Sequence, residues 1–288
     1  MARKRRRSYE YRDKLPWGRT IVLTLITLVA LAGIIAFCRQ QIMARGVKSV
    51  PGNITAEALM EVEGAPALGS NLPVDYKYMK IGFNPELHIP NWVAWELTRD
   101  HLYGHAKRGK FLPDPDVEGC VDSRAYTGSG FDRGHMCPAA DNKWNEEAMR
   151  ECFLMTNICP QDRRFNGGIW KKLEDYSRSW ADVDSAIIII CGPIYDPEPD
   201  EFIGREEVAV PKRFFKVFCS PWANPPRALG YIMNNGDNPQ GFRHTACSVD
   251  DVEAATGYDF FAALPDSIEN EIETQAFPHQ WRISRDDD

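Results

Sequence analysis

Residues 131–144 read FDRGHMCPAADNKW, and residues 154–178 read LMTNICPQDRRFNGGIWKKLEDYSR. The first stretch places His135 at the end of a DRGH tetrapeptide. An imidazole beside an arginine and near carboxylates is a candidate general base. Gly134 lets the backbone approach a ligand closely, because glycine has no Cβ. These two stretches decide the fold class and the chemistry that we expect.

The second stretch repeats functional side chains at every fourth position. Asn166, Trp170, Glu174 and Arg178 follow this spacing, and a helical pattern covers residues 169–180. On an α-helix such residues form one slowly drifting ridge, so an amide, a carboxylate and a guanidinium face one region. The positive end of the helix dipole favours a phosphate nearby. The amide and carboxylate oxygens are hard ligands that suit Mg²⁺.

The whole pattern resembles the DNA/RNA non-specific endonuclease family, the ββα-metal nucleases. The resemblance is strongest over residues 131–178 and extends more loosely over 76–265. The matching positions are DRGH at 132–135, Asn157, Pro160, Gln161, Asn166, Gly168, Trp170, Leu173, Glu174 and Arg178. The internal spacings make this pattern far more specific than the DRGH tetrapeptide alone.

The resemblance implies a metal site and a general base. His135 is implied to take a proton from the attacking water. Asn166 is implied to be the one direct protein ligand of Mg²⁺, for which Mn²⁺ can substitute. Glu174 is implied to hold the waters bound to the metal.

The resemblance also implies the substrate and the groups that bind it. Arg133 and Arg178 are implied to bind the phosphate and to stabilise the charge of the transition state, and Asn157 is implied to order the site. The implied reaction is hydrolysis of DNA and RNA with little sequence preference, leaving 5′-phosphate ends. Positioning and electrostatic stabilisation dominate such chemistry.

The rest of the chain predicts an α+β domain with the ββα-metal nuclease fold. We expect a central, mainly antiparallel sheet flanked by helices, since apolar and alternating runs mark strands. The expected strands are 91–98, 155–160, 185–195, 207–219 and 228–233. The expected helices besides 169–180 are 144–152, 248–257 and 266–275.

The N-terminal part indicates a membrane anchor. Residues 20–38 are apolar and uncharged over a length that spans a bilayer core. Residues 1–19 are basic, which places them in the cytoplasm. Residues 39–75 look like a linker, and 76–288 form the nuclease domain. We therefore expect one transmembrane helix in the inner membrane and a single-pass protein whose domain is exported, periplasmic or extracellular; a cleaved signal peptide is the alternative.

The charge balance argues against a nucleic-acid binder. Residues 1–48 hold eleven basic and two acidic residues, which leaves 23 basic and 39 acidic residues in the body. That body has a net charge near −16, whereas phosphate binding needs Lys and Arg. Several basic residues fall within 131–178, so a local basic cleft on an acidic body remains compatible with the sequence.

Cysteines and the remaining histidines give weaker signals. Seven of the eight cysteines follow residue 75, and an oxidising compartment would permit disulfides, with Cys219 and Cys247 as the first candidate pair. His101 and His105 have the spacing of a zinc pair. The central glutamate of such a motif is absent, which disfavours a metal site there.

Simpler interpretations exist for the individual residues. Asn166 could be only a helix N-cap, and Glu174 with Arg178 could be only a surface ion pair. Two other functions also fit the chain. It could be a catalytically silent, nucleic-acid-binding envelope protein, or a phosphodiesterase that acts on another substrate.

Overall fold

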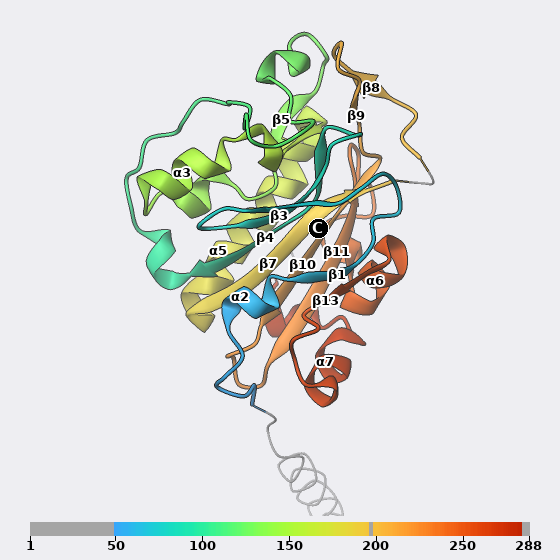
Figure 1. The fold of residues 1–288 in the computed structure, drawn as a ribbon. Coiled ribbons are helices and arrows are strands. Elements are labelled where there is room, and N and C mark those ends of the chain that lie inside the picture. Colours follow the sequence, from blue (N-terminus) through green and yellow to red (C-terminus); the bar gives the residue numbers. More distant parts are fainter. Residues whose placement is uncertain (1–48, 196–197, 284–288) are drawn as a thin grey trace, which may run out of the picture. The chain divides into compact units, whose positions relative to one another are not determined.

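A seven-stranded sheet forms the centre of the fold (Figure 1). The computed structural model describes residues 49–195 and 198–283. All neighbouring strands of this sheet pair antiparallel, as the sequence predicted. In spatial order the strands are β12 (Ala246–Cys247), β11 (Arg227–Asn234), β10 (Arg213–Ser220), β7 (Ala186–Ile194), β4 (Ile89–Thr98), β3 (Lys80–Asn84) and β2 (Leu72–Asp75).

Strand β7 shows why the sheet is central. Ile187 and Ile189 point into one apolar core, and Ile188 and Ile190 point into a second core on the opposite face. A strand that is covered on both faces needs apolar residues at every position, which explains the continuous run of isoleucines. The predicted buried strand is confirmed.

Helices cover both faces of the sheet. Figure 1 shows α3 and α5 on one side and α6 and α7 on the other. The α-helices are α2 (Ala56–Leu59), α3 (Glu146–Cys152), α4 (Arg163–Phe165), α5 (Lys171–Asp184), α6 (Val249–Thr256) and α7 (Asp266–Glu273). Shorter 3-10 turns are η1 (Arg99–Leu102), η2 (Ser123–Tyr126), η3 (Ala139–Asn142), η4 (Met155–Asn157), η6 (Arg243–Thr245) and η7 (Pro278–Trp281), and η5 (Asn166–Trp170) is a π-helix.

Three two-stranded sheets complete the fold. They are β5 (Asp132–His135) with β6 (Ile158–Gln161), β1 (Val62–Gly64) with β13 (Tyr258–Phe260), and β8 (Phe202–Ile203) with β9 (Val208–Ala209). The first pair leads through α4 and η5 into α5. Two antiparallel strands followed by a helix form the expected ββα unit, and α5 packs this unit against β4 and β7.

The structure corrects two predicted boundaries. The domain begins before residue 76, because α2, β1 and β2 lie within the predicted linker 39–75. Strand β1 pairs with β13, nearly two hundred residues along the chain, and such short elements carry no periodicity of their own. The predicted strand 207–219 splits at Pro211 into β9 and β10, since proline cannot donate a ladder hydrogen bond.

The predicted disulfide is wrong. All seven cysteines among the described residues are free. Cys219 lies on β10 and Cys247 on β12, and β11 separates these two strands. Two cysteines on strands that are not neighbours are too far apart to be bridged.

The predicted N-terminal segments 1–19 and 20–38 lie outside the described residues. Among residues 49–195 and 198–283, no helix has the length and apolar character needed to cross a bilayer. The described part of the chain belongs to one compact unit, Lys48–Asp288.

A substitution at Gly192 tests how closely β7 packs against β4. A Cβ atom at this position would lie 2.1 Å from the backbone oxygen of Asn91 on β4. We expect Gly192→Ala to lower the free energy of unfolding by about 2–3 kcal/mol, because β4 and β7 must separate. Gly52→Ala is the control, since a Cβ there meets nothing within 4 Å. Urea denaturation measures both, and equal stability of the two variants would contradict this account.

Candidate active site

His135 ends strand β5 inside an aromatic cage. Its ring centroid lies 5.2 Å from that of Phe111 and 4.8 Å from that of Phe153. The indole nitrogen of Trp170 donates to the backbone oxygen of His135 over 3.4 Å, which ties the strand to the helix region. Nε2 of His135 is buried and has no hydrogen-bond partner within the described residues. The imidazole is therefore held by packing, with a nitrogen left for another partner.

The cage keeps His135 neutral. Burial lowers its pKa to about 3, and the nearby guanidinium of Arg108 acts in the same direction. Both effects disfavour the charged imidazolium. A neutral imidazole has a nitrogen lone pair that can accept a proton, as a general base requires, although the same burial makes it a weaker base.

Asn157 fixes the backbone that follows His135. Its amide oxygen accepts from the backbone N–H of Cys137 over 2.9 Å. Its amide nitrogen donates to the backbone oxygens of Cys137 and Cys152 over 2.9 and 2.8 Å. The fully buried Asn157 thus joins the chain after β5 to the end of α3.

Arg133 lies on the same strand and points toward η2. Its Nε and Nη2 atoms donate to the backbone oxygen of Ser123 over 3.0 and 2.7 Å, and Nη2 also donates to Thr127. Arginine has five N–H donors, so these contacts orient the guanidinium without using all of them.

The structure explains the glycine at position 134 differently from the prediction, which was close approach to a ligand. A Cβ at this position would lie 2.1 Å from the side-chain oxygen of Gln161. The missing side chain makes room for the buried Gln161 on β6, rather than for a ligand.

Asn166 lies at the start of η5 and is not a helix N-cap; it is the C-cap of α4. Asp162 is the N-cap, because its side chain accepts from the N–H groups of Arg164 and Phe165. The amide nitrogen of Asn166 donates to Asp132 over 3.1 Å. This contact orients the amide, whose oxygen accepts no hydrogen bond from any residue that the structure describes.

The helical ridge is interrupted between Asn166 and Trp170. The π-helix contains Gly168 with φ −106° and ψ −109°, outside the helical region. Trp170 and Leu173 are fully buried, so they belong to the core and not to the site. Asn166 is therefore placed by the π-turn and by Asp132, not by a continuous α-helix.

Arg178 binds a buried carboxylate. Its Nη1 donates to Asp141 over 2.9 Å, and the Asp141 side chain is 1% exposed. A second contact joins Arg178 to Asp175, three residues earlier on α5. The simpler interpretation of an ion pair between Glu174 and Arg178 is not what the structure shows.

Glu174 is a half-buried carboxylate among other charges. Burial raises its pKa to about 7, and Lys216 opposes this shift. Lys216 is 1% exposed, and its ammonium lies 3.9 Å from the ring centre of Trp170. A carboxylate with a raised pKa is readily ionised by an added cation.

An open groove of about 650 Å³ runs beside His135. Arg133, Asn166 and Phe111 line it, and the Phe111 ring also packs against the imidazole. Glu174 and Arg178 do not line this groove, so the structure brings only part of the predicted set to one surface. The lining residues are Arg108, Phe111, Tyr126, Thr127, Gly128, Gly130, Phe131, Asp132, Arg133, Arg163 and Asn166.

Sequence reasoning missed Arg108, Phe111 and Lys216. Arg108 and Phe111 belong to the stretch HAKRGKF at 105–111, whose basic residues were a usable signal for a phosphate-binding segment. The sequence around Lys216 gives no signal of a functional site, because nothing distinguishes a single lysine in an apolar strand from any other lysine. His101 is structural, since it stacks on Trp144 with 4.0 Å between ring centroids.

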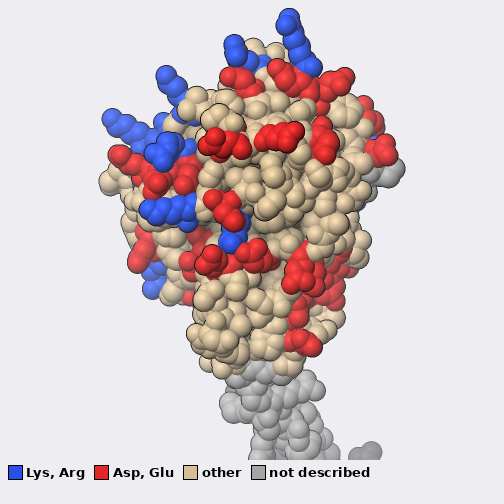
Figure 2. All heavy atoms as spheres, in the orientation of Figure 1, with Lys and Arg blue, Asp and Glu red and all other residues tan. Residues whose placement is uncertain are grey.

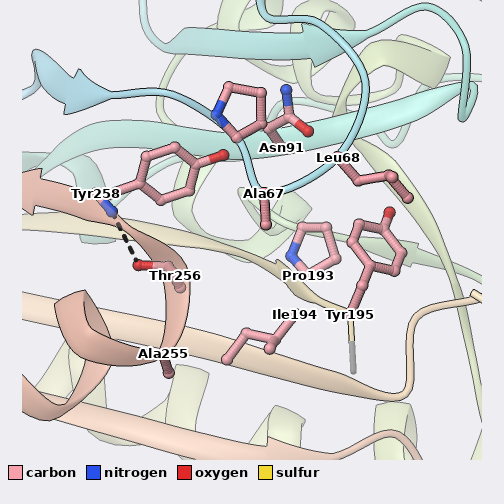
Figure 3. Close-up of a pocket in the computed structure, with 10 residues that line it drawn as sticks. Ala67, Leu68, Asn91, Pro193, Ile194, Tyr195, Ala255, Thr256 and Tyr258 are labelled. Atoms are coloured by element: carbon pink, nitrogen blue, oxygen red, sulfur yellow. Dashed lines mark hydrogen bonds between the residues drawn. The ribbon is translucent and has the colours of Figure 1, made fainter. Parts of the chain in front are cut away.

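A second pocket lacks the catalytic and phosphate-binding residue types of the groove region. Figure 3 shows it between the loop at Ala67, the end of β7 at Tyr195, and Tyr258 of β13. Its volume of about 20 Å³ holds about one water molecule. No histidine, arginine or carboxylate lines it, so this pocket is not a candidate catalytic site.

Comparisons with known proteins place the chain among nucleases. A model of the DNA/RNA non-specific endonuclease family matches residues 58–267. The chain is 36% identical over 204 residues to "Nuclease EXOG, mitochondrial" of Danio rerio, a match that covers 64% of this chain and 59% of that protein. It is 31% identical over 211 residues to "Nuclease" of Nostoc sp., with 68% and 75% covered.

A solved structure shares the fold. The crystal structure of the EndoG/EndoGI complex contains a chain with a TM-score of 0.58 and 24% identity, covering 67% of this chain and 86% of that chain. The chain spans about three fifths of the length of the mitochondrial EXOG relatives that it matches, 59–63%.

The prediction of a single-pass, inner-membrane protein with an exported domain is contradicted. Relatives from Mus musculus and Schizosaccharomyces pombe are named "Nuclease EXOG, mitochondrial" and "Nuclease 1, mitochondrial". The prediction rested on residues 20–38, and a basic segment followed by an apolar one does not separate an anchor from a targeting signal.

The raised pKa of Glu174 predicts that its contribution to stability depends on pH. Because the pKa is higher in the folded than in the unfolded protein, this contribution is fully present at low pH and is lost as pH rises through about 7. In EDTA-treated protein, we expect Glu174→Gln to be more stable than the wild type by up to about 3 kcal/mol at pH 8.5, and the difference to vanish near pH 4.5. Urea denaturation across this range, with the exposed Glu146→Gln as control, measures it. A difference that is constant with pH would contradict the shift.

Proposed function

Because this chain belongs to the DNA/RNA non-specific endonuclease family, we propose that it hydrolyses phosphodiester bonds of DNA and RNA with little sequence preference. The observation that carries the proposal is the caged, neutral His135 beside a groove lined by Asn166 and three arginines. Contacts to the phosphate backbone position a nucleic acid without reading its bases.

His135 acts as the general base. Its lowered pKa keeps it neutral, and its packing between Phe111 and Phe153 fixes the direction of the ring. The buried Nε2 has no hydrogen-bond partner in the described part of the chain, so it is left to accept the proton of an attacking water that enters beside the groove. Asn157 keeps the following backbone in place.

The hard oxygen donors of Asn166 and Glu174 suit one hydrated Mg²⁺, with Mn²⁺ as a substitute. Asn166, which lines the groove, would supply the direct protein ligand, and Glu174, which does not line it, would act on the ion through waters of the hydration shell. Mg²⁺ prefers hard oxygen ligands and keeps several waters. The raised pKa of Glu174 supports this role, because a nearby cation restores its ionised form. When bound, the ion stabilises the charge of the leaving 3′ oxygen, which gives 5′-phosphate ends.

Arginines bind the phosphates. Arg133 lies in the groove and keeps free N–H donors beyond its bonds to Ser123 and Thr127. Arg178 does not line the groove, so to contact a phosphate it would release the exposed Asp175 and keep its bond to Asp141. Together they stabilise the charge of the transition state.

The groove also answers the objection from net charge. Arg108, Arg133 and Arg163 all line it, and Asp132 is the one carboxylate among its lining residues. Asp132 is already bonded to Arg163 over 3.2 Å. A local basic surface therefore coexists with an acidic body, and a charged cleft acts on its ligand through its local field.

Substitution of the base tests the reaction. We expect His135→Ala in the full-length chain to slow Mg²⁺-dependent cleavage of plasmid DNA and of RNA by about 10²-fold or more, because no other group takes the proton. Binding of the same substrates should persist. His279→Ala, at an exposed position on η7, is the matched control. If the wild type binds nucleic acid but leaves it intact with Mg²⁺ or Mn²⁺, the protein is a silent binding protein instead.

Arg108 tests the groove as the nucleic-acid surface. We expect Arg108→Gln to weaken DNA binding and to reduce the slope of log K against log salt by about 1, since one phosphate contact is lost. Arg99→Gln is the control, because Arg99 bonds to Asp182 outside the groove. Fluorescence anisotropy at several salt concentrations measures both, and an unchanged slope in Arg108→Gln would place the nucleic acid elsewhere.

A further inference from the structure

Three carboxylates converge on the sheet face opposite the groove. Asp250 and Glu253 lie on α6, and Glu273 lies at the end of α7. Each offers one carboxylate oxygen, and these oxygens all lie within 4.8 Å of one another. Like charges at this separation repel, so the cluster needs either bound protons or a cation.

Glu273 is the unusual member of this cluster. It is 4% exposed, and its Oε1 has no hydrogen-bond partner among the residues that the structure describes. No Lys or Arg among the described residues forms an ion pair with Glu273, Asp250 or Glu253. A buried carboxylate without a partner is costly, and burial with the neighbouring carboxylates raises the pKa of Glu273 to about 9.

The surroundings add more negative charge. Asp259 on β13 and Glu269 on α7 both act on Glu273 electrostatically, and the pKa of Glu269 is itself raised to about 6 by burial and its acidic neighbours. Figure 2 shows acidic atoms along the side where α6, β13 and α7 lie, with no basic atoms among them. The local field therefore favours a cation.

The spacing fits a calcium ion. Ca²⁺ binds oxygen ligands at about 2.3–2.6 Å, so ligands on opposite sides of one ion lie about 4.6–5.2 Å apart. Ca²⁺ also accepts irregular geometry, whereas Mg²⁺ demands a near-ideal octahedron. One oxygen of Glu253 already accepts from the backbone N–H of Phe260 over 2.9 Å, which orients that side chain and leaves its second oxygen for the ion.

We propose that Asp250, Glu253 and Glu273 bind one Ca²⁺ ion that joins α6 to α7. Both helices pack their apolar residues into the same core, which also contains Phe260 of β13. The ion adds a polar link at the outer edge of that core. This site is separate from the groove, which lies with α3 and α5 on the other face, and its role is to stabilise the fold.

Calcium titration tests the site in the full-length chain. We expect EDTA-treated Asn166→Ala protein, which lacks the proposed groove ligand, to bind one Ca²⁺ by calorimetry. Its melting temperature should rise by about 5 °C or more at 100-fold excess over Kd. Adding Glu273→Gln should abolish both the binding and the shift. Adding Glu271→Gln, exposed on the same helix, should preserve them.

The Glu273→Gln protein is expected to fold, because the substitution keeps the shape of the side chain and removes a buried carboxyl. Circular dichroism and a melting temperature in EDTA at or above that of the Asn166→Ala parent would establish this. If Ca²⁺ leaves the parent unchanged, or if Glu273→Gln responds as Glu271→Gln does, the proposal is overturned and the cluster is held by protons. Neither outcome bears on cleavage of nucleic acid.

Discussion

The buried carboxylate of Asp141 holds the candidate site together. It accepts from Nη1 of Arg178 over 2.9 Å and from the indole nitrogen of Trp95 over 3.2 Å. Burial raises its pKa, and the Arg178 guanidinium opposes that shift. Breaking one partner of a buried pair costs about 3–5 kcal/mol. Helix α5, which carries Glu174, is thereby fixed against β4 and the turn that follows His135.

The fold was predictable where a residue's environment is set by its own neighbours in the chain. The isoleucines of β7 and the aromatic and β-branched residues of β4 predicted both strands, because a strand that is covered on both faces carries apolar residues at successive positions. Strand β1 was not predictable, since its only strand partner is β13 at the other end of the chain. The π-turn at Gly168 was hidden too, because regular spacing implies a regular helix.

The residues of the candidate site also differ in how far the sequence could predict them. Residues close in sequence, such as Asn166 and Glu174, could be singled out by spacing and by the family resemblance. Lys216 could not, because it acts on the site from a distant strand. Arg108 was missed although the basic stretch around it was a usable signal. The need for glycine at position 134 was explained wrongly, since Gln161 faces this position only after β5 and β6 pair. Such contacts depend on tertiary pairing, which a single sequence does not record.

The acidic composition misled because net charge adds up both faces of the sheet. Screening in physiological salt reduces interactions beyond about 8 Å, and the sheet with its helix layers is thicker than that. The carboxylates of α6, β13 and α7 therefore act on their own face. A phosphate in the groove meets Arg108, Arg133 and Arg163 instead. Attraction of a nucleic acid follows from where the charges lie in the fold, so an acidic body and a phosphate-binding groove are physically compatible.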